Sequence, residues 1–430
     1  MCNSDNSNAP ILDTQEDADN AQKQMLKFIR GLRTMLPNVK NIRLDWDCDE
    51  SVEPSDFLTT IVSKMISGII DGVKNVAYLD SENLIENISF DPDVFSGLTS
   101  FHYYFNGADK RGLDIILRNC DTLQNLTVEE MPAKFIDPML YRENGDSIVF
   151  GCLKSLYLSY PTGTISSDTQ DYKCHFPALQ KLNIHGSDPI ISNAVFNGTE
   201  QLEYLGLWNT YDTVDNINDQ QMFKHCQLRN LKHLMLSYNC KASQVSLNNE
   251  PNKINQYSKF IGNLIKQPDC LQSLSLTSSR FETKLLYVLS TTTAFANIQR
   301  MEFTMIAMRF EDIVSVIRNC PQLNFLHCSP VNSYPSIDGI KDAELVMLLE
   351  TSMYPLSKYL ASVYVDFQRF WLSRETHLAL ALLAVGCPRL SNVNCFSAHL
   401  NTMQEGMREL ADDSIFSDYR HRLQTIVAKY

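Results

Sequence analysis

Few residues in this chain are spaced as a catalytic or metal-binding site requires. Asp45, Asp47 and Asp49 resemble the first ligands of a calcium-binding loop. The sixth position of such a loop needs a glycine for its sharp turn, and the twelfth is normally a glutamate. This chain has Glu50 and Asp56 there. We therefore expect a solvated acidic loop rather than a calcium site.

Two adjacent cysteine–histidine pairs are the remaining candidates for a metal site. Cys174-His175 and His225-Cys226 lie in different repeats, without the tight spacing that is typical of zinc ligands. We therefore expect no metal and no cofactor. The chain also lacks the P-loop, GxGxxG, HExxH and GxSxG motifs, and we expect that it is not an enzyme.

The pattern that dominates the sequence is a repeat with apolar residues at its first, fourth and sixth positions. It is clearest in the units that begin at Leu153, Leu179, Leu202, Leu231 and Leu271. This spacing is the leucine-rich-repeat signature, in which each repeat contributes one short strand to a stack. Extending the template gives thirteen repeats, which begin at Val39, Val73, Leu98, Leu123, Leu153, Leu179, Leu202, Leu231, Leu271, Ile298, Leu323, Leu360 and Leu390.

The segments between the strands often have helical spacing of their apolar residues, as in 113–120, 260–265 and 313–320. We therefore predict an α/β fold: a leucine-rich-repeat solenoid, or horseshoe, of about 11–14 irregular repeats. Parallel strands should form its concave face and helices its convex face. A rival match at Ile85 leaves the repeat count open by one or two.

The ends of the chain differ from the repeats. Residues 1–20 are polar and are predicted to be disordered. We expect a capping helix at 21–38, the solenoid at 39–412 and a second capping helix at 413–430, because the last repeat at each end of a solenoid has no neighbour to cover it.

Composition limits the partners and the compartment. The net charge of −13 argues against a broad basic surface for nucleic acid. No apolar run reaches the roughly 20 residues that span a bilayer, so no membrane is expected either. The twelve cysteines form no CxxC pair, and no secretory signal is visible. We expect reduced thiols in the cytoplasm or nucleus, buried at the recurrent repeat positions Cys120, Cys320, Cys328, Cys387 and Cys395.

The residues between the apolar positions should line the concave face, because side chains alternate along a strand. Aromatic residues and histidines are enriched there, while the charges nearly cancel: Arg43, Lys181 and Arg300 against Asp45, Glu129, Glu302 and Asp366. We predict a protein-binding face centred on the strip from Tyr157 to Met235; the other interpretation is that large side chains merely cover a wide sheet. The predicted binding residues are Tyr104, Tyr157, His185, Tyr204, Trp208, His233, Met235, Phe325, His327 and Tyr364.

The repeats that begin Cys320-Pro-Gln-Leu323 and Cys387-Pro-Arg-Leu390 resemble the cysteine-containing leucine-rich repeats of F-box/LRR proteins. The resemblance covers about residues 21–400, and the fold it implies resembles the ribonuclease-inhibitor-like horseshoe. In that family the horseshoe holds a substrate, and an F-box docks on a Skp-type adaptor of a cullin-type ubiquitin ligase. No F-box is recognisable in the 38 residues before the first repeat.

We therefore expect a non-catalytic protein-binding scaffold, and hold open that it is the substrate-recognition part of a cullin-type ubiquitin ligase in ubiquitin-dependent protein degradation. Its partner would be a protein, with a Skp-type adaptor as the second candidate. The alternative is a GTPase-activating protein of the Ran-activating leucine-rich type. That type has more regular repeats and an acidic C-terminal tail, whereas this chain ends in Lys429-Tyr430. A ribonuclease-inhibitor-like binder would need an acidic face.

Overall fold

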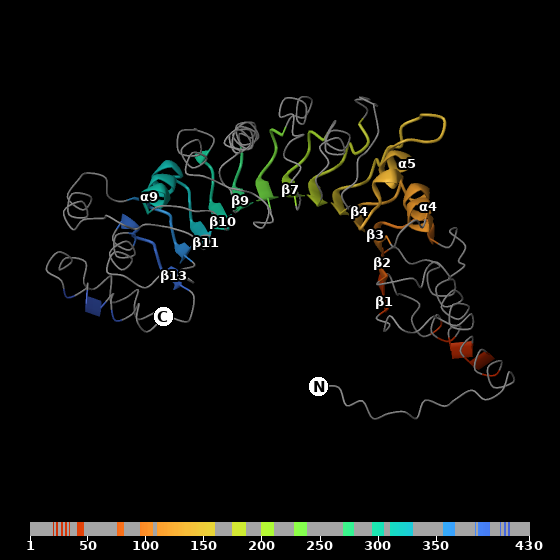
Figure 1. The fold of residues 1–430 in the computed structure, drawn as a ribbon, viewed down its shortest axis with the longest axis horizontal. Helices are drawn as coiled ribbons and strands as arrows, with labels where there is room; N and C mark the ends of the chain where they lie inside the picture. Colours follow the sequence, from red (N-terminus) through yellow and green to blue (C-terminus); the bar gives the residue numbers. More distant parts are fainter. Residues whose placement is uncertain are drawn as a thin grey trace, which may run out of the picture. The chain divides into compact units, whose positions relative to one another are not determined.

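The computed structural model describes the strands, the turns that precede them and several helices (Figure 1). The described ranges are 41–46, 75–80, 95–105, 110–159, 174–185, 199–209, 228–238, 270–278, 295–304, 310–329, 356–365 and 386–395, with scattered helical positions in 20–34 and 383–412. The chain divides into two compact units, Met1–Pro161 and Thr162–Tyr430.

Among the residues described in the first unit, five parallel strands follow one another in chain order. They are β1 (Asn41–Trp46), β2 (Asn75–Asp80), β3 (Ser100–Tyr104), β4 (Asn125–Glu129) and β5 (Ser155–Ser159). Its described helices are α4 (Arg111–Arg118), the 3₁₀ turn η2 (Ala133–Phe135) and α5 (Ile136–Leu140). Each strand pairs with the strand of the next repeat, as a leucine-rich solenoid requires.

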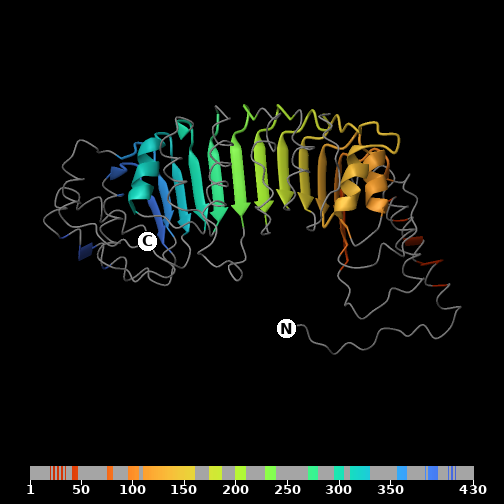
Figure 2. The same cartoon turned by 45° about the horizontal axis from the view of Figure 1, so that its top comes forward.

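The described part of the second unit has the same plan, with eight parallel strands and helix α9 (Phe310–Asn319). Within each unit the helices labelled in Figure 1 lie on the outer side of the strands, and Figure 2 shows neighbouring strands side by side. The strands are β6 (Lys181–His185), β7 (Tyr204–Asn209), β8 (His233–Tyr238), β9 (Ser273–Ser278), β10 (Arg300–Thr304), β11 (Phe325–Ser329), β12 (Ser362–Val365) and β13 (Asn392–Cys395).

The predicted fold class is therefore confirmed, and the repeat starts are confirmed with it. Every predicted repeat contains a described strand that begins two residues after the predicted start, from Asn41 in the first to Asn392 in the last. The helices predicted at 113–120 and 313–320 correspond to α4 and α9. Several predicted features lie outside the described residues: the rival match at Ile85, the helix at 260–265 and the segments 1–19 and 413–430. The predicted domain boundaries therefore stay predictions.

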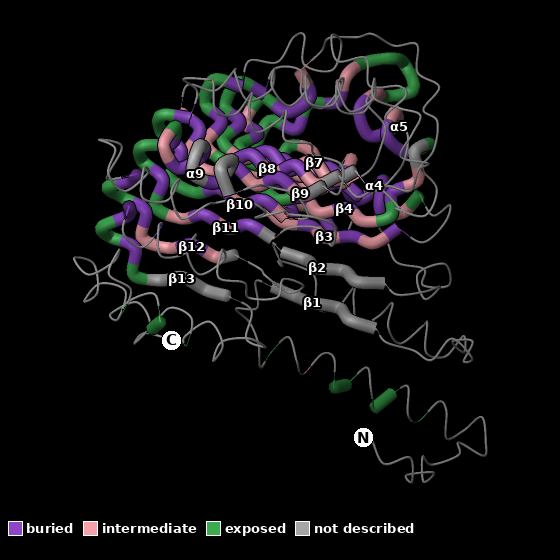
Figure 3. Tube along the Cα trace, turned by 60° about the vertical axis from the view of Figure 1, so that its left-hand side comes forward, coloured by how far each residue is buried: buried purple, intermediate pink, exposed green. Residues whose placement is uncertain are grey.

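The three apolar residues of each repeat form the core. In the repeat that begins at Leu153, that residue, Leu156 and Leu158 are all buried, and the same positions are buried in neighbouring repeats. Side chains between them are less buried, so buried and intermediate positions alternate along the tube in Figure 3. Burial of this apolar face against the next repeat is the main favourable term in such a stack.

A second core position lies three residues before the first apolar residue of several repeats. The sequence identified cysteines at this position, but the phenylalanines that occupy it in other repeats were not singled out. Phe95, Phe150, Phe176 and Phe295 are buried three residues before the first leucine or isoleucine of their repeats. The carbonyl of this residue commonly accepts a hydrogen bond from the backbone N–H three positions later, as from Leu153 to Phe150 at 3.3 Å. The aromatic ring therefore fills the space beneath the turn that leads into the strand.

The cysteine expectation needs one correction. Cys320, Cys328 and Cys387 are buried as predicted, but Cys120 is only partly buried. Its neighbour Asn119 takes the buried place, donating to the carbonyls of Phe95 (2.6 Å) and Ile115 (2.8 Å) and accepting from the N–H of Leu98 (2.9 Å). In this turn a buried amide with three hydrogen-bond partners fills the space. In the equivalent turn after α9 the Cys320 thiol is buried instead, 4.0 Å from the Met301 sulfur. The side chain of Cys395 lies outside the described ones.

Helix α4 packs closely on the buried side of β3. A Cβ at Gly112 would lie 2.2 Å from Cε1 of Tyr103, so the absence of a side chain lets the helix reach the ring. The Tyr103 and Phe105 rings pack edge to face with their centres 4.8 Å apart, and the centres of the Phe105 and Phe135 rings lie 5.6 Å apart. This aromatic packing holds α4 and the turn η2 against the buried side of the sheet.

Phe150 and Val149 are adjacent residues with opposite burial, which gives a matched test of the aromatic core position. Phe150 is fully buried and Val149 is 43% exposed. Phe150→Ala should lower the free energy of unfolding by about 3–5 kcal/mol because it leaves a cavity. Val149→Ala should change it by less than about 0.5 kcal/mol. Urea denaturation followed by circular dichroism measures both, and equal losses would contradict this assignment of the core.

Burial raises the pKa of the Cys320 and Cys328 thiols to about 12, from an ordinary value of 9.0. Since the thiolate is the nucleophile, N-ethylmaleimide at neutral pH should label the exposed Cys152 and spare Cys320, Cys328 and Cys387 until the chain unfolds. The unfolded chain loses these protons first, so the free energy of unfolding should fall as pH rises from about 9 towards 12. Peptide mapping by mass spectrometry measures the labelling, and rapid modification of Cys328 in the folded chain would be the contrary result.

Candidate functional site

We call the face of the strands opposite α4, α5 and α9 the open face. Its residues occupy alternate strand positions, because successive side chains of a strand point to opposite sides. All ten residues predicted from the sequence to bind a partner lie on it, and nine of them are half-buried while His233 is exposed. Tyr104 and Tyr157 belong to the first unit and the other eight to the second.

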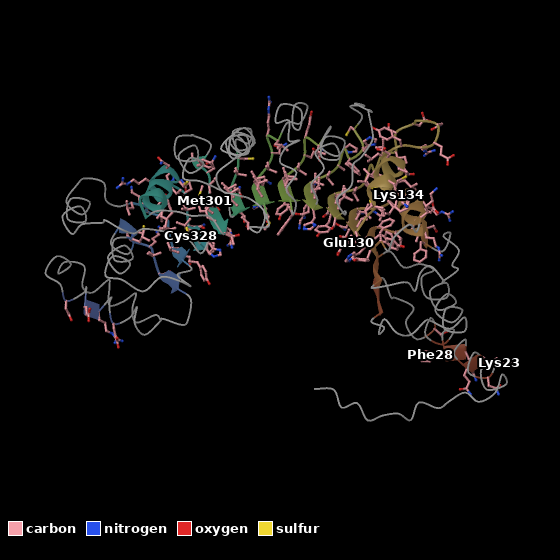
Figure 4. All side chains as sticks on the ribbon, in the orientation of Figure 1. Lys23, Phe28, Glu130, Lys134, Met301 and Cys328 are labelled. Carbon is pink, nitrogen blue, oxygen red and sulfur yellow. The ribbon has the colours of Figure 1, made fainter. Side chains whose placement is uncertain are left out.

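The open face of the first unit contains a histidine–glutamate pair beside a tyrosine. His102 on β3 lies 2.8 Å from Glu129 on β4, between Nε2 and Oε1. Burial raises the pKa of the Tyr157 phenol on β5, and the negative charges of Glu129 and Glu130 raise it further. Glu130, labelled in Figure 4, follows β4 with a left-handed backbone (φ 51°), which turns the chain at the edge of the sheet. The described part of this face is acidic around Tyr157.

Five of the predicted residues come together on β6, β7 and β8 of the second unit, and we call them the Tyr204 cluster. The cluster consists of His185, Tyr204, Trp208, His233 and Met235. The sheet register places His185 beside Trp208 and Tyr204 beside His233. The Tyr204 hydroxyl donates to the Met235 sulfur at 3.6 Å, and the Tyr204 and His233 rings lie 6.3 Å apart.

The neighbours of Tyr204 complete its surroundings. The Lys181 ammonium lies over the Tyr204 ring at 5.0 Å from its centre, and burial raises the pKa of the Tyr204 phenol. The hydroxyl is therefore neutral at physiological pH and can act as a hydrogen-bond donor. The cluster presents aromatic faces, one sulfur and several polar tips, which is the chemistry of a binding surface that anchors another molecule.

The remaining three predicted residues form a separate group on β11 and β12, which we call the Tyr364 cluster. His327 and Tyr364 meet edge to face at 4.5 Å. The Arg300 guanidinium lies over the Phe325 ring, with its central carbon 3.9 Å from the ring centre. Arg300 also forms an ion pair with Glu302 and donates a hydrogen bond to it from Nε at 2.9 Å. The arginine and the glutamate therefore satisfy one another, and the ring and the guanidinium are pre-packed.

The ten predicted residues do not form one continuous group. Strands β9 and β10 lie between the Tyr204 cluster and the Tyr364 cluster, and the open-face residues of β9 are Ser273, Ser275 and Thr277. Sequence reasoning missed Asn183 and Gly206, which the register places on the same row as Met235. Aligning the repeats on their leucines would have found both, because neighbouring repeats pair at equal offsets. The side chains of Arg43 and Asp45, and residue Asp366, lie outside what the structure describes.

One of the two cysteine–histidine pairs considered as metal ligands lies in the described part of the chain. His175 is buried and Cys174 is partly buried at the turn before β6, while His225 and Cys226 lie outside the described residues, as does the acidic loop 47–56. Among the described residues, no group of three or more His, Cys, Asp or Glu is placed to hold a metal ion. No described helix has the length and apolarity needed to cross a membrane.

Comparison with known proteins identifies no family. No protein-family model and no curated protein sequence matches the chain. Similar solved structures include a chain from the yeast Rad7 and Elc1 complex, with 15% identity, a TM-score of 0.36 and coverage of 88% of this chain and 89% of that one. Another comes from a TLR13–ssRNA13 complex, with 13% identity, a TM-score of 0.38 and coverage of 76% and 47%. The fold assignment here rests on the register and burial of this chain's own repeats.

The Tyr157 phenol offers a test of the electrostatics of the first unit. Glu129→Gln removes a negative charge that raises the Tyr157 pKa, so that pKa should fall towards its ordinary value. The pKa of Tyr204, which burial alone raises, should stay where it is. Titration of tyrosines carrying a ¹³C label at Cζ, followed by NMR, measures both. An unchanged Tyr157 pKa would show that Glu129 does not act on the ring.

Proposed function

We propose that this chain is a non-catalytic protein-binding scaffold, and that it holds its partner on the open face of the second unit. The observation that carries the proposal is the Tyr204 cluster, where two aromatic residues, two histidines and a methionine share three adjacent strands while staying half-buried or exposed. Large aromatic side chains that are already packed lose little entropy on binding, which is why they dominate interface hot spots.

The alternative interpretation, that large side chains simply cover the sheet, is less able to account for the neighbouring strand. The β9 residues that pair with the open-face positions of β8 are only serine and threonine, so this sheet does not need large residues to cover it. In the second unit the aromatic residues of this face are Tyr204 and Trp208 on β7, Phe325 on β11 and Tyr364 on β12, and the described open-face positions of β9 and β10 carry none. A grouped distribution of this kind fits a surface that contacts a partner at particular places.

The test is partner capture by a tagged full chain from cytosolic and nuclear extracts, with mass spectrometry of what is recovered. Tyr204→Ala with Trp208→Ala should abolish recovery of the specific partner, because hot-spot truncations typically cost about 2 kcal/mol or more each. Ser275→Ala with Thr277→Ala, on the same face, should leave recovery intact. Circular dichroism should show both variants folded, because neither pair belongs to the buried core. Equal recovery by the aromatic double variant and the wild type would overturn the proposal.

The finer form of the proposal is that the scaffold is the substrate-recognition part of a cullin-type ubiquitin ligase. Its support is the resemblance of the Cys320 and Cys387 repeats to those of F-box/LRR proteins. Co-purification of a Skp-type adaptor and a cullin with the wild-type chain is the expected result. Recovery of partners that depend on Tyr204 and Trp208, without adaptor or cullin, would keep the scaffold and overturn the ligase role.

A further inference from the structure

Gly206 lies at the centre of a three-by-three arrangement of open-face positions, which we call the Gly206 grid. The register of β6, β7 and β8 sets its rows, each with one residue from each strand. Its nine members are Lys181, Asn183 and His185 on β6, Tyr204, Gly206 and Trp208 on β7, and His233, Met235 and Ser237 on β8.

The centre of the grid has no side chain of its own, and two polar groups converge on it. A Cβ built on Gly206 would lie 2.1 Å from Oδ1 of Asn183 and 3.3 Å from Nε1 of Trp208. The Asn183 carboxamide therefore occupies the space that a side chain at 206 would fill. Gly206 is not among the described residues with positive φ, so a glycine is required here for space rather than for backbone conformation.

These polar groups remain available to a ligand. Within the described structure, neither the Asn183 carboxamide nor the Trp208 indole N–H has a hydrogen-bond partner. Neither group is among the fully buried polar atoms that lack a partner, so both can be reached from solvent. A carboxamide offers both an acceptor and donors, and an indole offers a donor. An extended peptide main chain presents the matching pair, one N–H and one C=O in each residue.

The charge of the grid is opposite to that of the whole chain. It contains no Asp or Glu, and its ionisable basic residues are Lys181, His185 and His233, in a protein of net charge −13. At its rim, Glu203 is neutralised by Lys232 at 3.0 Å. Beyond β9, Glu302 is ion-paired to Arg300. The grid therefore favours an acidic ligand, since complementary charge sets specificity and the rate of encounter.

We propose that the Gly206 grid binds an extended peptide segment rich in Asp or Glu, with the Asn183 carboxamide holding its main chain between the rings of Tyr204 and Trp208. This inference rests on the proposed function and names the chemistry of the partner. Lys181 is the one lysine or arginine in the grid. Single-stranded nucleic acid, which is usually bound by a track of several cations along its backbone, is thereby disfavoured against a peptide.

The test uses a random 12-residue peptide library displayed on phage, selected on the full chain, followed by affinity measurements on the enriched peptides made synthetically. The enriched peptides should carry Asp or Glu. Gly206→Ala, which pushes the Asn183 side chain aside, and Asn183→Ala, which removes it without a clash, should each weaken binding by about tenfold or more. Ser275→Ala, on the same row two strands from Gly206, should bind as the wild type does.

Three results would overturn the inference: enriched peptides without an acidic bias, unchanged affinity in both Gly206→Ala and Asn183→Ala, or tighter binding of a decauridylate RNA than of any peptide. Its failure is separable from failure of the proposed function. If Tyr204→Ala with Trp208→Ala abolishes partner capture while Gly206→Ala and Asn183→Ala bind normally, the scaffold function stands and the proposed peptide chemistry is wrong. If the aromatic double variant retains its partner, the proposed function itself fails.

Discussion

Burial of the apolar triplet against the next repeat is the interaction on which the rest of this structure depends. A single repeat cannot remove its own leucines from water, so it becomes stable only when a neighbour packs on it. The parallel backbone pairing follows, with each strand bonded to the one before it at a constant offset. Because the triplet must face inward, the residues between its members must face outward, and the chain acquires an open face as a consequence of forming a core.

That constraint leaves the outward positions free to carry other chemistry, and the two units use them differently. Around Tyr157 in the first unit the face is acidic, with Glu129 held by His102. Around Gly206 in the second unit it contains no carboxylate and gathers aromatic rings instead. Near β10 the charged residues satisfy one another. Among the described residues, the β6–β8 region therefore combines aromatic anchors with hydrogen-bonding groups that have no partner, which is what a binding surface needs before its ligand arrives.

Much of this could be predicted from the sequence, because the repeat period specifies both the strand and the face. The start of every strand, and the open-face placement of residues such as Trp208 and Tyr364, followed from the leucine spacing alone. The burial of Asn119 in place of Cys120 could not be predicted. Either residue fits the repeat pattern, and which of them is buried depends on hydrogen bonds between Asn119 and the backbone of Phe95 and Leu98 in the preceding repeat. The approach of the Asn183 side chain to Gly206 could not be predicted either, because it depends on the rotamer that Asn183 adopts on the neighbouring strand.

The central claim is that the partner lies on the open face of the second unit, and site-specific photo-cross-linking tests it most directly. A benzophenone amino acid is placed either at Met235 or at Asp114, an exposed position on α4 behind the sheet of the first unit. On irradiation in extract, the chain labelled at Met235 should capture the partner covalently, and the chain labelled at Asp114 should not. Capture from Asp114 with none from Met235 would contradict the account, because it would place the partner on the helical side.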